Sequence, residues 1–114
     1  MAYDYAWEKF YAAVHSLATG EGSLQERLGY ACSGALVRLR DEDLPREMRD
    51  EFKELMSALT REEAKGEEGT IAATMHVMDS AEARKHADTI LSMYDQLAKR
   101  DPVNEYHQRG SATS

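Results

Sequence analysis

Apolar side chains recur every three or four residues along most of this chain. In the first segment, for example, Trp7, Phe10, Val14 and Leu17 keep this spacing. Such a spacing places them on one face of a helix that has about 3.6 residues per turn. Alternating apolar and polar residues, the pattern of a half-buried strand, do not continue over several positions anywhere. The pattern therefore predicts an all-α fold.

Turn and cap residues divide the helical pattern into segments. The four main helices are expected at about 4–18, 24–39, 45–59 and 70–99, and the last is either continuous or broken near Asp79 and Ser80. Gly20 and Gly22 end the first helix, and Ser23 with Glu26 forms a capping box that starts the second.

The remaining boundaries rest on single residues. Asp4 is the expected N-cap of the first helix, and Ser80 is the expected cap after the break. Pro45 suits the first turn of the third helix, where its missing N–H does no harm.

The length of 114 residues suits one domain with a single core. Because short connections place successive helices side by side, we expect a small antiparallel helical bundle. Residues 1–101 form this domain in our interpretation. Residues 102–114 form a polar C-terminal tail that is loose or docked on a partner, since it has too few apolar groups to hold itself on a core.

The charge balance excludes some classes of partner. The chain has 21 Asp and Glu against 14 Lys and Arg, a net charge of −7. Nucleic-acid binding depends on clustered Lys and Arg, so no nucleic-acid partner is expected. No stretch approaches the roughly 18 apolar residues of a membrane span, and the first residues do not resemble a signal peptide. The sequence therefore predicts a cytoplasmic protein that makes no membrane contact.

The familiar catalytic motifs are missing from the sequence. It has no Gly-rich phosphate loop, no Gly-x-Ser-x-Gly, no Cys-x-x-Cys and no His-Glu-x-x-His. The single Cys32 lies in an apolar helical pattern without a basic neighbour to lower its pKa. We expect a buried small hydrophobe there rather than a nucleophile, and no cofactor.

One group of residues has the chemistry of a metal site. His76, Asp79, Glu82 and His86 follow one another at spacings of three, three and four residues. On one continuous helix this spacing would align all four side chains. Imidazole and carboxylate groups are ligands for zinc, iron or manganese, so these are candidate metal ligands. The alternative is a solvated polar face, since the chain lacks the Glu-x-x-His pairs of metal sites in helical bundles.

Arg100 and His107 enclose the six residues from Asp101 to Tyr106. This spacing resembles the Arg-x(4 to 6)-His signature of the HEPN superfamily, small all-helical domains of which many are metal-independent ribonucleases. The resemblance covers these two residues and the all-helical character, and it implies that the pair acts on a scissile phosphate at a dimer interface. Pro102 departs from the family pattern, because proline disfavours the helix on which the pair lies in that family.

Aromatic residues are concentrated at the start of the chain, where they comprise Tyr3, Tyr5, Trp7, Phe10 and Tyr11. The helical spacing puts Trp7, Phe10 and Tyr11 on the stripe that faces the core. Tyr3 and Tyr5 point in other directions, which leaves amphipathic rings for a contact with a subunit or partner.

The second expected helix is unusual in having no charged residue between Leu28 and Val37. Its small residues are Gly29, Ala31, Ser33, Gly34 and Ala35, and the glycines leave room for another helix to approach closely. A helix that is uncharged on several sides needs neighbours on several sides. We therefore predict a homo-oligomer, with a two-fold dimer favoured. The alternative is that this helix is the centre of a monomeric bundle.

These observations favour a non-enzymatic protein–protein interaction or regulatory module. The missing motifs argue against an enzyme, and the apolar stripes are wider than one small bundle needs. A HEPN-like metal-independent ribonuclease is the alternative, and a metal-binding helical bundle is the second alternative.

Overall fold

The described part of the chain is built from helices alone. The computed structural model describes residues 3–64 and 69–100, and within these ranges it contains no strand. The α-helices are α1 (Asp4–Thr19), α2 (Leu24–Gly34), α3 (Arg46–Leu59), α4 (Gly69–Val77) and α5 (Ser80–Arg100), and the 3₁₀ helices are η1 (Leu36–Arg38) and η2 (Asp41–Asp43). The predicted all-α class is confirmed. The expected tail at 102–114 lies outside the described residues.

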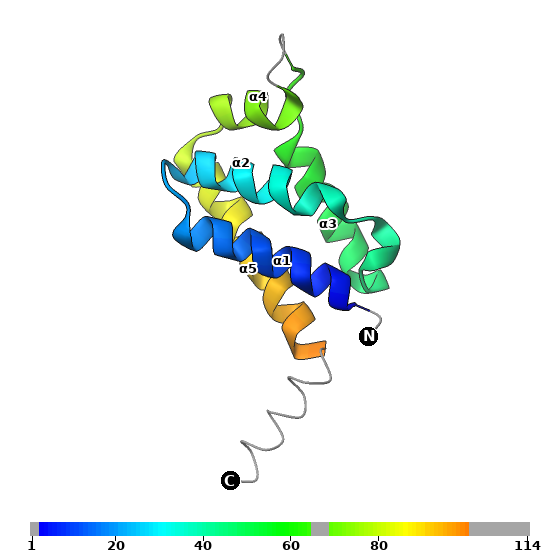
Figure 1. Cartoon of the computed structure of the whole chain (residues 1–114). Helices are drawn as coiled ribbons and strands as arrows, with labels where there is room; N and C mark the ends of the chain where they lie inside the picture. The colour runs from blue at the N-terminus through cyan, green and yellow to red at the C-terminus, as the bar shows by residue number, and fades with distance from the viewer. Residues whose placement is uncertain (1–2, 65–68, 101–114) are drawn as a thin grey trace.

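α2 lies in the middle of the other helices and packs against α1, α4 and α5. Figure 1 shows α1 and α2 side by side and running in opposite directions, with α4 along the other side of α2 and α5 crossing behind. The core between them contains the fully buried side chains of Phe10, Leu28, Leu36, Ile90 and Met93. Because α4 is a separate helix, the described ranges hold five α-helices rather than four. The antiparallel four-helix arrangement stays a prediction.

A membrane span would need a long apolar helix. Among the helices within 3–64 and 69–100, none is both long and apolar enough to cross a bilayer.

The turn between α1 and α2 follows the sequence signals. The Ser23 hydroxyl accepts the Glu26 backbone N–H at 3.1 Å, and the Glu26 carboxylate accepts the Ser23 N–H at 3.2 Å, so the predicted capping box is confirmed. Gly22 has φ +94°, a left-handed conformation that favours glycine. The Arg27 guanidinium donates to the Leu17 carbonyl at 2.8 Å and so ties the two helices together across the turn.

α2 ends five residues earlier than the spacing predicts. It stops at Gly34, and the chain continues as η1 rather than as an α-helix to Leu39. A side chain at Gly34 would have no neighbour within 4 Å, so the close packing expected there is wrong. Glycine also lowers helix stability by about 1 kcal/mol relative to alanine. Leaving the helix here turns the chain so that Leu36 becomes fully buried.

The helical pattern of 70–99 is interrupted at Met78 and Asp79, which agrees with the broken alternative. The cap differs from the expectation, because the Asp79 carboxylate, not the Ser80 hydroxyl, accepts the Glu82 backbone N–H, at 2.8 Å. Met78 is buried in the core, which holds the break in place.

The start of α1 also differs from the expectation. Asp4 is the first helical residue, and Tyr3 is the N-cap. Phe10 is fully buried, but Tyr11 is 49% exposed, because consecutive residues on a helix point about 100° apart. The expected core position of Tyr11 is therefore wrong, whereas Tyr3 packs against the core.

The two glycines of α2 form a matched pair for testing this packing. A Cβ atom at Gly29 would lie 3.0 Å from Met75 Cγ, whereas one at Gly34 would meet nothing. We expect Gly29→Val to lower the free energy of unfolding by about 1–3 kcal/mol through overpacking. Gly34→Ala should raise it by up to about 1 kcal/mol, because Gly34 has no positive φ to preserve. Urea unfolding followed by circular dichroism measures both, and shifts of the same sign would contradict this description.

Candidate functional site

An open groove of about 970 Å³ lies between α2 and α4. Gly29, Tyr30 and Ser33 line it from α2, and Ala72, Met75 and His76 line it from α4. The two helices lie next to each other in Figure 1, where α4 covers the side of α2 that faces away from α1. A groove between helices is a common place for a ligand or partner to bind.

The floor of the groove is set by the close approach of α4 to α2. A Cβ atom at position 29 would lie 3.0 Å from Met75 Cγ, and Ile71 also lies near this position. The close helix contact predicted for Gly29 is therefore confirmed. Among the described residues, the acidic and basic side chains that line the groove are Glu26 and His76, and the Glu26 carboxylate is engaged in the capping box.

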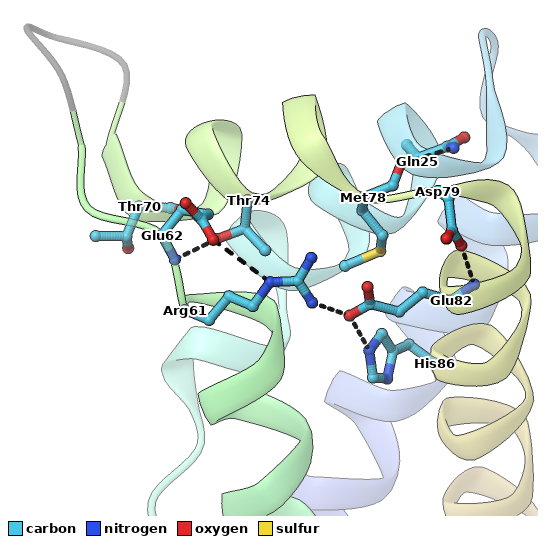
Figure 2. A network of polar contacts seen from close by, with 9 residues as sticks. All are labelled: Gln25, Arg61, Glu62, Thr70, Thr74, Met78, Asp79, Glu82 and His86. Atoms are coloured by element: carbon cyan, nitrogen blue, oxygen red, sulfur yellow. Dashed lines mark hydrogen bonds and ion pairs between the residues drawn. The ribbon is translucent and has the colours of Figure 1, made fainter.

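Polar contacts tie α4 to α2 and to the segment after α3. The Gln25 amide of α2 donates to the Met78 carbonyl at the end of α4, at 3.1 Å. The buried Thr74 hydroxyl donates to the Thr70 carbonyl within α4 at 2.7 Å and accepts the Glu62 backbone N–H at 3.1 Å. Figure 2 shows both sets of contacts, and Thr70, Thr74 and Met78 all precede the break between α4 and α5 at Asp79. The outer wall of the groove is therefore anchored by hydrogen bonds as well as by apolar packing.

Arg61, Glu82 and His86 join the end of α3 to α5 (Figure 2). The Arg61 guanidinium forms an ion pair with the Glu82 carboxylate, and His86 Nε2 lies 3.1 Å from the same carboxylate oxygen. The hydrogen bond from Arg61 is the main cause that lowers the pKa of Glu82, and the contact with His86 acts in the same direction. Glu82 is therefore an ionised structural group at neutral pH rather than a proton donor.

The four candidate metal ligands do not come together in the structure. Glu82 and His86 contact each other, whereas Asp79 caps α5 and His76 lines the groove on α4. The break at Met78 and Asp79 explains this separation, because alignment of all four required one continuous helix. Among residues 3–64 and 69–100, no group of three or more His, Cys, Asp or Glu side chains is placed to hold a metal ion.

Only one member of the HEPN-like pair lies in the described ranges. Arg100 ends α5, and its guanidinium forms an ion pair with Glu47 of α3. His107 lies outside the described residues.

Cys32 is fully buried on the side of α2 that faces the core. Burial raises the pKa of its thiol from the ordinary 9.0 to about 11. This confirms the small buried hydrophobe expected from the sequence.

A comparison with protein-family models, with curated protein sequences and with solved structures found no match.

The ion pair at Glu82 predicts a pH dependence of stability. A carboxyl group whose pKa is lower in the folded state contributes stability above its unfolded value, near 4.5, and loses that contribution as the pH falls through the lowered value. Glu82→Gln should therefore destabilise the protein at about pH 7, and the difference from wild type should shrink by about pH 3. Glu51→Gln, which removes an exposed carboxylate of α3, is the control for the change in net charge. A Glu82→Gln effect that is constant between these two pH values would contradict the assignment.

Burial of Cys32 predicts slow thiol labelling. A rise in pKa from 9.0 to about 11 leaves roughly one hundredth of the thiolate at a given pH. An aromatic disulfide reagent should therefore label the native protein at least about 100-fold more slowly than the urea-unfolded chain. Equal labelling rates would show that Cys32 is accessible.

Proposed function

We propose that this protein is a non-enzymatic protein–protein interaction module that binds the apolar face of a partner helix in the groove between α2 and α4. The observation that carries the proposal is the scarcity of charged residues in the parts of α2 and α4 that line the groove. No Asp, Glu, Lys or Arg occurs between Leu28 and Val37 or from Gly69 to Met78, although 31% of the chain is charged. An amphipathic helix that lays its apolar face into such a groove is a recurring form of peptide recognition.

The exposure of apolar groups at the groove supports the same function. α4 has apolar residues around its whole circumference, and its Val77 is 56% exposed. A helix that is apolar on all sides is normally buried. Tyr30, at the edge of the groove, is 60% exposed, and tyrosine is one of the residues that contribute most to binding at protein interfaces.

Local contacts give the two alternative functions less support. A HEPN-like ribonuclease would need Arg100 free to meet a phosphate, and in the structure Arg100 pairs with Glu47. A metal site would need carboxylates that are not already engaged, and Asp79 caps a helix while Glu82 pairs with Arg61. Our proposal includes two further points. The four longer helices form an antiparallel bundle, with α4 completing the groove, and the protein is cytoplasmic.

A designed helix tests this function without a known partner. The probe is a fluorescein-labelled peptide of about 18 residues, or five helical turns, with Ala and Leu on one face and Gln and Lys on the other. We expect saturable binding by fluorescence anisotropy, with backbone amide shifts at Gly29, Tyr30 and Ser33. Ala72→Arg places a charge in the exposed wall of the groove and should weaken binding at least about tenfold.

Ala12→Arg is the matched control, because Ala12 is an exposed alanine on α1, away from the groove. It should leave binding of the peptide unchanged. No saturable binding, or binding that Ala72→Arg and Ala12→Arg affect equally, would refute the proposed function.

A further inference from the structure

We propose that the helix that occupies the groove belongs to a second copy of this chain, so that the protein is a two-fold dimer through α2 and α4. This inference rests on the proposed function and names its partner. In such a dimer, α2 and α4 of one copy lie on the same two helices of the other, and Tyr30 of each copy enters the opposite groove.

The charge of the chain favours this face for self-association. Each copy has a net charge of −7, so two copies repel each other unless their contact avoids acidic side chains. The two charge-free runs, 28–37 and 69–78, lie on neighbouring helices, and among the described residues Glu26 is the one carboxylate that lines the groove between them. Pairing this face with itself therefore brings few like charges together.

The same charges argue against a basic partner helix. An acidic protein attracts basic partners, but a tight complex with one needs free carboxylates at the contact. Within the described ranges, Glu26 is the one carboxylate that lines the groove, and it already accepts the Ser23 N–H in the capping box. The groove therefore suits an uncharged helix surface, and α4 of this chain presents such a surface in Ala72 and Val77.

The shape of the face meets the requirement of two-fold symmetry. A two-fold interface uses one patch on both subunits, so that patch must contain both a projection and a matching hollow. Tyr30 is the projection, since most of its side chain is exposed at the edge of the groove. The hollow lies beside it and is lined by the small residues Gly29, Ser33 and Ala72.

The other aromatic surface is less suited to this role. On α1 and α5, the Trp7 ring stacks on Tyr11 with centroids 5.5 Å apart, and both rings contact Tyr94 at 6.1 and 6.3 Å. These rings already cover one another. Tyr30 has no aromatic neighbour within the described ranges, so its ring gains more from burial in a second copy.

Sedimentation equilibrium of the full chain from about 1 to 500 µM measures the association. We expect a mass that rises toward twice 12.8 kDa. Tyr30→Ser and Ala72→Arg should each raise the dimer dissociation constant at least about tenfold. Tyr5→Ser and Ala12→Arg, which alter an exposed tyrosine and an exposed alanine of α1, should not change it. Circular dichroism confirms that each variant is folded.

A mixed sample of ¹³C-labelled and unlabelled protein locates the interface. We expect intermolecular nuclear Overhauser effects between the Tyr30 ring and the methyl groups of Ala72 and Met75. Effects between Tyr11 and Leu91 instead would place the contact on α1 and α5 and overturn the inference.

The two proposals can fail separately. A mass of 12.8 kDa across the whole range refutes the dimer, and the proposed function survives if the designed peptide still binds and Ala72→Arg weakens that binding. A dimer that Tyr30→Ser and Ala72→Arg leave intact also refutes this inference. If, in addition, no peptide binds, the groove has no binding role and both proposals are wrong.

Discussion

α4 can lie against α2 because position 29 has no side chain. Met75 occupies the space that a side chain at Gly29 would need, and close-packed interiors do not absorb such an addition without movement. The contact fixes more than this pair of helices, because the chain leaves α4 through the buried Met78 and begins α5 at Ser80. A side chain at position 29 would therefore require Met75, and with it this wall of the groove, to shift.

In this arrangement, several apolar side chains of α2 and α4 remain exposed to water. α4 buries Ala73 and Thr74 against its neighbours but exposes Ala72 and Val77, and Tyr30 of α2, which lines the groove together with Ala72, is also exposed. Each Å² of apolar surface removed from water is worth about 25 cal/mol. Charged residues are frequent elsewhere in the chain, yet the runs 28–37 and 69–78 contain no Asp, Glu, Lys or Arg. An interface that covers these walls would gain the corresponding free energy, which is the physical reason to assign function to this face.

Local signals predicted where helices start, whereas tertiary contacts decided where one of them ends. Ser23 and Glu26 stabilise the start of α2 through side chains three residues apart, so the sequence alone suffices to predict that cap. The spacing of apolar residues through Leu39 is equally consistent with a longer helix. The chain instead turns after Gly34 and buries Leu36, and that choice depends on where α1 packs against this segment. Periodicity within one helix contains no information on its neighbours.

The candidate ligand residues show why regular spacing along a chain does not ensure proximity. Only Met78 and Asp79 lie between α4 and α5, yet this break puts His76 on the groove and leaves Glu82 and His86 with each other. Asp79 is used by the backbone, since a carboxylate is favoured at the start of a helix. The groove could not be predicted from the sequence, because Gly29 and Met75 lie in different helices, far apart along the chain. The available signal was the second charge-free run, at 69–78. One such run fits a helix buried at the centre of its own bundle, but two runs on neighbouring helices, each with exposed apolar side chains, are the reason that we propose a binding surface there.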